Sequence, residues 1–584
     1  MRKSMEAVSA KEDLFVRRDV SWKRWVALAG VAVMSPMVSA QDKPPASAIT
    51  LDEQQQRERT QRQAQEREGR NQAPDVRLDR EASSSFHTLT LPDETHCIAL
   101  HSIRLVGERV ADFQFVQRYL SQYVGRCVGH EGISLIVRRA GDLIVGRGYV
   151  TTRIGMQAQD ISQGVLTITL VPGVIHAIRM ADGSPSQDWR WALPMRAGDL
   201  LNLRDIEQGL EQMKRVPSQD VAIDIAPTQG TGQSDLLITI KHSKPWRVVA
   251  TLDDSGAAVT GLYQAGLNLG IDNPLHANDL LSLGVTHDVL NGSGRATQGI
   301  NGNYSIPRGN WLFTASLYGY RYNQTVEGSA QTFNSSGTSK SVDLGAQRLL
   351  YRNKNSKTTA ELHIGKRWAH SFIEDVELDS QRRDMSMVEA AIAHRHYLGN
   401  AQLDLRLAEH FGVPWFGGQR DHAGHTRSDP TFRYHLSVLD ASLNLPFKVG
   451  KQPVQWTSEL HGQYSDNHLY ASEYIGIGGR YTVRGFDGDQ TLAAERGWYW
   501  RNTLTLPVSH WPFAFYAGLD AGRVSGPGTA YIPSNTALSG GFFGLRGTFG
   551  EHLSWDAFAG KALHGRSLLE NTRPAIGFQL VYSY

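Results

Sequence analysis

The feature that most constrains this chain is a long alternation of apolar and polar side chains with a period of two residues. It runs from about residue 246 to residue 584, in segments separated by clusters of Gly, Asn, Ser, Asp and Pro. Such alternation predicts antiparallel strands with one apolar and one polar face. The alternating segments include 311–318, 402–407, 439–445, 454–461, 513–520 and 576–584.

The polar face of these strands decides between two architectures. In a soluble sandwich the apolar faces meet in a core, whereas in an outer-membrane barrel they face lipid and the polar face lines water. Here the polar face carries Asp404, Arg406 and Glu459, and full charges favour a water-lined lumen. At about 21 residues per strand and connection, the region holds about 16 strands. Because lipid tolerates no open sheet edge, we expect them to close into a transmembrane antiparallel β-barrel.

Residues 1–40 are typical of an export signal. Basic residues precede an apolar run from Trp25 to Met34, and Val38-Ser39-Ala40 offers the small residues of a cleavage site. The alternative is a single membrane anchor, but the run is well short of the roughly 20 apolar residues that a spanning helix needs. We therefore expect an exported protein whose mature chain begins at Gln41.

Residues 51–70 form a segment of almost only Gln, Glu, Asp and Arg, with good helix formers throughout. A helix that is polar all round cannot dock on an apolar core. The residues alone leave it as a solvated linker or as a helix inside a polar channel.

Residues 95–245 predict two similar α/β units of about 75 residues. Each has the order strand, helix, helix, strand, strand, and the final strands match at an offset of 70 residues. The corresponding apolar positions are Leu166, Ile168 and Leu170 in the first unit and Leu236, Ile238 and Ile240 in the second. Units of this kind leave strand edges to which an extended peptide can add.

Cys97 and Cys127 are the two cysteines of the chain. An even count in an exported protein predicts an intramolecular disulfide within the first unit, with two buried free thiols as the alternative. Two cysteines alone cannot form a structural zinc site, and the 21 His are scattered. We expect no metal and no cofactor.

Composition and motifs also exclude some functions. A net charge of +2 gives no basic footprint for nucleic acid. The sequence contains none of the common hydrolase, metalloprotease or nucleotide-binding motifs, so we expect no catalytic residues and no enzyme.

Two glycine-rich segments in the last third of the chain stand out. Gly476 to Phe486 (GIGGRYTVRGF) lies between predicted strands, and Gly518-Leu519-Asp520-Ala521-Gly522 lies on a later strand. By strand parity Asp520 points into the lumen. An Arg on a loop folded inward could make a strong charge-assisted contact with it, and the alternative is a solvated external loop.

These features together resemble a family, the two-partner secretion transporters of the outer membrane. The resemblance rests on Val483-Arg484-Gly485-Phe486 in a late loop, on GLDAG with Gly518 and Asp520, on the two α/β units and on the polar N-terminal helix. Further similar segments are 125–127, 147–153, 272–275 and 279–282. Tyr584 departs from the Phe that commonly ends such chains, although it keeps the aromatic character.

The resemblance implies an order of domains: a signal peptide at 1–40, a plug helix and linker at 41–94, POTRA domains at 95–171 and 172–245, and a barrel at 246–584. It implies that the loop with Val483, Arg484, Gly485 and Phe486 folds into the barrel and pairs with its wall at Asp520. The 51–70 helix is then expected in the pore.

The function that the resemblance implies is secretion of a large unfolded exoprotein, such as a haemolysin, an adhesin or a contact-dependent inhibition toxin. The POTRA domains would bind this partner in the periplasm. The other expected partners are outer-membrane lipid and, during insertion, the barrel-assembly machinery, with the chain as a monomer. The alternatives are a porin-like channel and a barrel-assembly factor.

Overall fold

The computed structural model describes residues 69, 74–78, 85–181, 189–290, 294–327, 331–509, 511–526, 536–565, 569 and 574–584. The predicted export signal at 1–40 lies outside the described residues. So does the predicted plug helix at 51–70, apart from Gly69.

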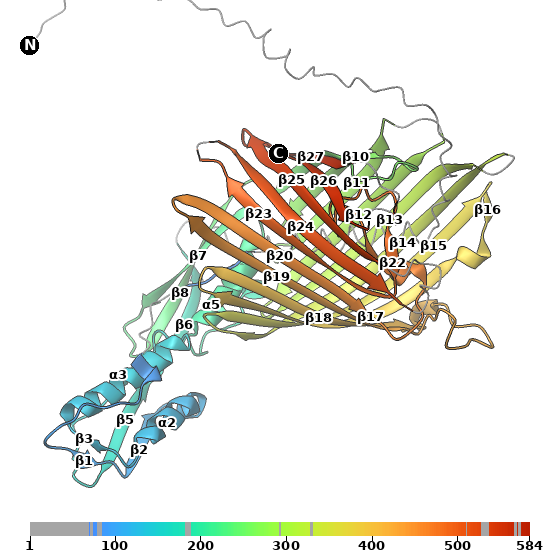
Figure 1. Cartoon of the computed structure of the whole chain (residues 1–584). Coiled ribbons are helices and arrows are strands. Elements are labelled where there is room, and N and C mark those ends of the chain that lie inside the picture. Colours follow the sequence, from blue (N-terminus) through green and yellow to red (C-terminus); the bar gives the residue numbers. More distant parts are fainter. Residues whose placement is uncertain are drawn as a thin grey trace, which may run out of the picture. The chain divides into compact units, whose positions relative to one another are not determined.

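The first α/β repeat is a three-stranded sheet covered by two helices (Figure 1). The sheet order is β2-β5-β4, with β2 and β5 parallel and β4 antiparallel to β5. Its elements are β1 (Ile98–Ala99), β2 (Ser102–Gly107), α2 (Gln114–Leu120), β3 (Cys127–Val128), α3 (His130–Gly146), β4 (Arg153–Gly155) and β5 (Val165–Val171), with 3-10 turns η2 (Ser85–His87), η3 (Val110–Phe113) and η4 (Ser121–Tyr123).

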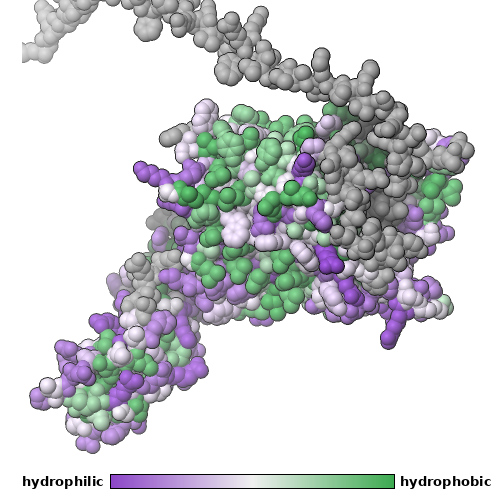
Figure 2. Space-filling view, in the orientation of Figure 1, coloured by the Kyte–Doolittle hydropathy of each residue, from purple (hydrophilic) through white to green (hydrophobic). Residues whose placement is uncertain are grey.

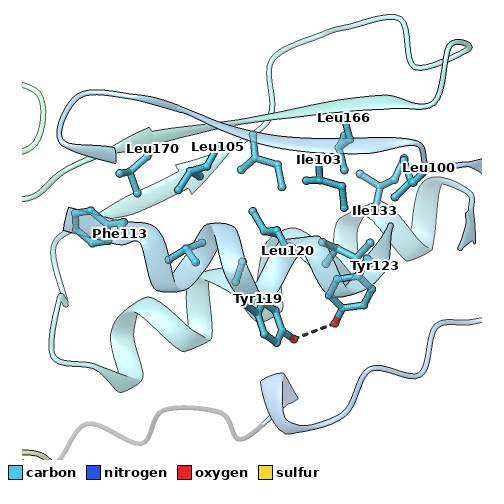
Figure 3. Close-up of a cluster of buried hydrophobic side chains, with 14 of the residues drawn as sticks. Leu100, Ile103, Leu105, Phe113, Tyr119, Leu120, Tyr123, Ile133, Leu166 and Leu170 are labelled. Atoms are coloured by element: carbon cyan, nitrogen blue, oxygen red, sulfur yellow. Dashed lines mark hydrogen bonds between the residues drawn. The ribbon is translucent and has the colours of Figure 1, made fainter. Parts of the chain in front are cut away.

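The core of this repeat explains why its strands alternate. Leu105 and Leu166 project from the sheet onto Phe113 and Leu120 of the helical layer (Figure 3). Leu166 and Leu120 have no exposed surface. The sequence predicts a strand at Tyr149–Ile154, but residues 149–152 form a turn and only the end of that range belongs to β4. Gly148, at φ 97°, ends the path of α3, and β4 therefore begins only at Arg153.

The second repeat has the same element order. Its strands β6 (Val174–Met180), β7 (Gln219–Pro227) and β8 (Gln233–His242) make a sheet of order β6-β8-β7, covered by α4 (Trp189–Ala192) and α5 (Leu203–Lys214). Leu236 and Ile238 of β8 are fully buried, as Leu166 and Ile168 are in the first repeat. The equivalence of the two final strands, read from the 70-residue offset, is thus visible in both cores.

A disulfide joins Cys97 to Cys127, as predicted. It lies beside the β1–β3 pair, where Ile98 is the register partner of Val128. Glu94 supports the same place, because its carboxylate accepts hydrogen bonds from the backbone N–H groups of Gly129, Glu131 and Gly132 at the start of α3. The chain entering the repeat is therefore attached covalently to β3 and, through Glu94, caps the start of α3.

Sixteen strands of the described chain close into an antiparallel barrel, which confirms the predicted fold class of a barrel preceded by two α/β repeats. The strands are β9 (Trp246–Asp253), β10 (Tyr263–Asp272), β11 (Leu280–Val289), β12 (Ala296–Arg308), β13 (Trp311–Glu327), β14 (Thr332–Arg352), β15 (Ser356–Ile373), β17 (Arg383–Leu398), β18 (Ala401–Val413), β19 (His435–Val449), β20 (Gln452–Tyr464), β23 (Arg496–Pro507), β24 (Phe513–Ser525), β25 (Ala537–Phe549), β26 (Leu553–His564) and β27 (Ala575–Ser583). The two-residue β16 (Val376–Glu377) folds back and pairs antiparallel with the end of β15.

The barrel closes where its last strand meets its first. β27 is antiparallel to β9, and the backbones of Tyr584 and Val248 exchange two hydrogen bonds of 3.1 and 2.9 Å. The Lys244 ammonium lies 3.6 Å from the ring centre of Trp246 and 3.4 Å from that of Tyr584. The aromatic C-terminus thus takes part in the seam.

The outer face of the barrel is apolar. Leu317, Leu407 and Leu519 are 57%, 53% and 63% exposed, and apolar side chains gather over the strands in the space-filling view (Figure 2). An apolar surface of this extent is unfavourable in water, so lipid is the environment that fits the outer face of the barrel. No helix among the described residues is long and apolar enough to cross a membrane.

Candidate functional site

The candidate site is a loop, residues 465–495, that joins β20 to β23 and packs against the inner wall of the barrel. It contains the turn η7 (Ala471–Glu473) and a short hairpin, β21 (Ile475–Ile477) with β22 (Leu492–Ala494). Its apolar side chains, Val483 and Phe486 among them, form a buried cluster with Tyr499, Val524 and Leu538 of the wall. The loop therefore has a core of its own inside the lumen, which a solvated external loop would lack.

The structure places Arg484 of this loop against Asp520 of β24. The guanidinium makes a two-pronged contact, with Nε 2.6 Å from Oδ2 and Nη2 2.8 Å from Oδ1. The carboxylate also accepts the backbone N–H groups of Arg484 and Asn502 at 3.0 and 3.2 Å. The Asp520 side chain has no exposed surface and that of Arg484 is 10% exposed. Protein donors thus replace the water that Asp520 has lost.

An aromatic ring also contacts the guanidinium of Arg484. The guanidinium carbon lies 3.6 Å from the ring centre of Phe542 on β25, a distance typical of a cation–π contact. Gly518 makes room for this ring, because a Cβ there would stand 2.8 Å from the Phe542 ring and 1.8 Å from the Asn502 carbonyl oxygen. Gly518 thus helps to position Arg484 indirectly, by leaving space for the Phe542 ring.

Two further motif glycines, Gly485 and Gly522, and Gly540 of β25 leave space for the loop to pack closely on the barrel wall. Gly485, at φ 114°, lies so close to β25 and β26 that a Cβ would stand 2.7 Å from the Lys561 carbonyl oxygen. A Cβ at Gly540 of β25 would meet the Arg484 carbonyl at 1.8 Å. Gly522 similarly leaves space for the fully buried Val483. The glycines of VRGF and GLDAG therefore lie where the loop and the barrel wall are in close contact.

Two further ion pairs hold the loop at other points. Arg367 of β15 contacts Glu473 at 2.8 Å, and both side chains are largely buried, at 14% and 3% exposure. Arg480 contacts Asp254, in the connection after β9, at 3.2 Å. The loop is fixed to strands on different sides of the lumen, so moving it requires several buried charges to separate.

The wall beyond the loop carries a band of paired charges. Arg406 bonds Glu361 at 2.9 Å and also Glu389, and Asp404 and Glu459 pair with Arg395 and Arg501. A cavity of about 1180 Å³ lies between loop and wall, with Arg484, Arg501 and Glu459 in its lining. Charged residues on the inward face thus line a polar space.

One group in the described part of the chain brings potential metal ligands together: Glu361, His363 and Glu389, whose ligand atoms lie within 4.8 Å of one another. Arg406 already binds both carboxylates. This guanidinium offsets part of their charge without a metal ion, so the geometry favours an ion-pair network.

Sequence reasoning missed several residues of this site, namely Phe542, Gly540, Arg367 and Glu473. Gly540-Gly541 within a strand was a usable signal, because glycine inside a strand often marks close approach by another backbone. Arg367 and Glu473 carry no such signal, since 106 residues separate them.

Comparison with known proteins adds family evidence to this geometry. Residues 232–547 match the profile of the haemolysin secretion/activation proteins ShlB/FhaC/HecB. Residues 98–173 match a POTRA domain of the ShlB type, and residues 174–227 match another POTRA profile.

Individual relatives align over most of the chain. The outer membrane transporter CdiB-2 of Burkholderia pseudomallei is 39% identical over 586 residues, covering 96% of this chain and 100% of the relative. The hemolysin transporter protein ShlB of Serratia marcescens is 26% identical, over 71% of this chain and 73% of its own. Among solved structures, CdiB from Acinetobacter baumannii superposes with a TM-score of 0.80 at 26% identity, covering 93% of this chain and 100% of its own.

Proposed function

The chain belongs to the haemolysin secretion/activation family ShlB/FhaC/HecB, and we propose that it recognises a large unfolded exoprotein in the periplasm and secretes it through its barrel. Its barrel lies in the outer membrane, with the POTRA domains in the periplasm. The observation that carries the proposal is the combination of two α/β repeats with a polar lumen whose inner loop is pinned by Arg484 and Asp520. The porin-like alternative gives the repeats no role.

Capture of the exoprotein is supported by the edge of the first repeat. β2 is the outer strand of its sheet. The side-chain amide of Gln117 bonds the C=O of Ile103 and the N–H of Leu105, both at 2.8 Å. An amide side chain thus stands where the peptide groups of an added strand would pair. An unfolded exoprotein can displace it and extend the sheet.

The proposed route through the barrel needs no nucleotide. The extended exoprotein passes the lumen, where paired charges such as Arg406 with Glu361 give a polar wall that does not retain apolar side chains. Folding outside the cell then prevents return. We assign residues 51–70 to the pore as a plug, because a helix that is polar all round suits such a lumen.

The proposal includes the expected partners. Lipid surrounds the apolar outer face of the barrel. The aromatic strand end at Tyr584 is the signal that the barrel-assembly machinery would read during insertion. One chain encloses a complete lumen, so the transporter acts as a monomer.

Secretion itself is the direct test. The chain is produced in a bacterium with an outer membrane, together with a candidate exoprotein of the haemolysin, adhesin or contact-dependent inhibition type, and the exoprotein is measured in the medium and on the cell surface. Folded barrel with all exoprotein retained in the periplasm would overturn the proposal. Loss of other outer-membrane barrels on depletion of the chain would favour the barrel-assembly alternative.

The plug assignment predicts a change in conductance. Deletion of residues 51–70 should raise single-channel conductance in planar bilayers, because a helix in the pore displaces ions. Heat-modifiable migration of the barrel on gels is the control for folding. Unchanged conductance of a folded barrel would show that these residues are only a linker.

A further inference from the structure

Residues 74–78, Pro-Asp-Val-Arg-Leu, lie as an extended segment between the second repeat and the barrel, and we call them the strap. They form no strand or helix. Their contacts reach α5 of the second repeat on one side and β14 and β17 of the barrel on the other. The strap therefore occupies a site built from both domains.

Two buried charged residues hold the backbone of the strap. Glu207 of α5 accepts the N–H of Leu78 at 2.7 Å, and Arg352, at the end of β14, donates to the C=O of Val76. The side chains of Glu207 and Arg352 are 1% and 6% exposed and contact each other at 3.3 Å. A buried pair that binds one N–H and one C=O recognises a main chain whatever its side chains are.

Arg352 is also the residue that connects the two domains at this point. Its Nη1 lies 2.6 Å from Glu211 and 3.2 Å from Gln208, both on α5. Lys357, on β15, adds a second cation at Glu211. Although burial raises the pKa of Glu211, Lys357 and Arg352 lower it below its ordinary value, so the group is ionised at neutral pH.

Alternate side chains of the strap point to two different surfaces, one on the second repeat and one on the barrel. Val76 and Leu78 pack on the apolar core of the second repeat. Asp75 accepts a hydrogen bond from the Tyr397 hydroxyl, and the Arg77 guanidinium lies 4.1 Å from the centre of the Tyr397 ring. The site thus selects an extended chain with apolar side chains two residues apart.

We propose that this site is a docking site for extended segments of the exoprotein, and that the strap fills it in the resting protein. The inference rests on the proposed function. An unfolded exoprotein offers many segments with apolar residues at alternate positions, and the buried pair Glu207–Arg352 reads only their backbone. Tyr397 precedes the turn that connects β17 to β18, at the barrel end where the repeats attach, so a docked segment lies at the entrance of the lumen.

The first experiment tests the site without the exoprotein. Val76→Asp with Leu78→Asp should expel the strap, because both side chains lie against an apolar core. A fluorescent peptide of residues 71–82 should then bind this purified full-length variant at least tenfold more tightly than it binds the unaltered protein, measured by anisotropy. The control peptide, with Asp at both apolar positions, should bind no better to the variant. Two outcomes would overturn the proposed site: equal binding of the two peptides to the variant, or equal binding of the unaltered peptide to the variant and the unaltered protein.

The second experiment places the exoprotein there. A photo-reactive benzoylphenylalanine replaces Tyr397, or in a separate variant Tyr318, which lines the lumen cavity away from the strap. The exoprotein that the chain secretes is stalled in transit by a folded C-terminal fusion. Cross-links from both positions support the inference. Cross-links from Tyr318 alone would overturn it and leave the proposed function intact. Cross-links from neither position, together with no secretion of the exoprotein without the fusion, would overturn both.

Discussion

The periplasmic repeats and the barrel place their side chains in opposite ways. In the repeats the apolar residues are inside, as with Ile168 at 0% exposure. In the barrel Ile576 is 76% exposed on the outer face, while Asp520 and Glu473, at 3% and 2%, are buried within the lumen. The same alternation of apolar and polar residues builds both regions, but water lies on the opposite side of the sheet.

Because of this difference, interior residues have different roles in the two regions: in the repeats they determine stability, and in the barrel they serve function. Apolar packing holds the repeats together, so changes in their interior affect folding. The barrel is held by its ladder of backbone hydrogen bonds, and its buried polar contacts fix the loop within the lumen. We therefore expect interior changes in the barrel to affect secretion more than assembly. Four predictions test this contrast.

The largest effect is expected at Arg484. Arg484→Ala leaves the carboxylate of Asp520 buried without its partner, which costs about 3–5 kcal/mol for a fully buried pair and less where lumen water enters. We expect assembled barrel with strongly reduced secretion, measured as exoprotein in the medium per heat-modifiable barrel. Arg484→Lys should restore secretion only in part, because Lys lacks the planar fork that grips a carboxylate.

Controls for this prediction come from the same lumen. Arg501→Ala removes a cation that pairs with Glu459 of the wall at 3.1 Å, and it should reduce secretion less. The charge exchange of Arg484→Asp with Asp520→Arg tests whether the contact is direct. Normal secretion by Asp520→Ala alongside failure of Arg484→Ala would contradict the pairing and assign Arg484 another role.

The disulfide gives the next largest effect, and it should fall on the repeats. Cys97→Ser opens the loop to Cys127, 30 residues away. In the chain-entropy model this destabilises the first repeat by about 3–4 kcal/mol. Hydrogen exchange of the full chain should show loss of protection in α3 and β5, with the barrel unchanged. Two thiols that alkylate freely without reductant in natively exported protein would contradict the bond itself.

A matched pair of isoleucines compares the two interiors directly. Ile168→Val removes a methyl group from the core of the first repeat and should cost about 1 kcal/mol. Ile576→Val makes the same change on the exposed face of the barrel and should cost close to nothing. The two losses of stability are measured by urea denaturation, with the unfolding of each region monitored by hydrogen exchange. Equal losses would show that the outer face of the barrel is packed as tightly as a core.

The smallest effect concerns Glu94 and pH. Its hydrogen bonds from the backbone N–H groups of Gly132, Glu131 and Gly129 lower the pKa of this carboxyl below its ordinary value, against an opposing effect of burial. A lowered pKa means that the stabilisation is present at neutral pH and is lost as pH falls through the folded-state value. Glu94→Gln should therefore weaken exchange protection at the start of α3 at pH 7, and the difference from the unaltered protein should vanish at low pH. A constant difference at both pH values would assign the effect to packing.

Some of the fold was predictable because it depends on local periodicity. The alternation in 311–318 or 513–520 is a property of neighbouring residues, and one buried face is enough to fix it. The turn at 149–152 was missed because apolar residues there suggested a strand, while Gly148 at φ 97° redirects the chain. Strand parity predicted the inward position of Asp520, and the resemblance to the transporter family indicated Arg484 as its partner, although nothing in the sequence indicated the ring of Phe542 beneath the guanidinium.

The sequence alone determined the alternating strands, the two α/β repeats, the disulfide pair and the inward position of Asp520, because each follows from spacing within a short segment. Only the tertiary structure decided where the loop is anchored and what holds the strap. The hydrogen bond from Leu78 to Glu207 spans 129 residues, and that from Arg352 to Val76 spans 276. Contacts at such separations depend on how strands close into a barrel and how a repeat docks on its rim, and local patterns carry no record of either.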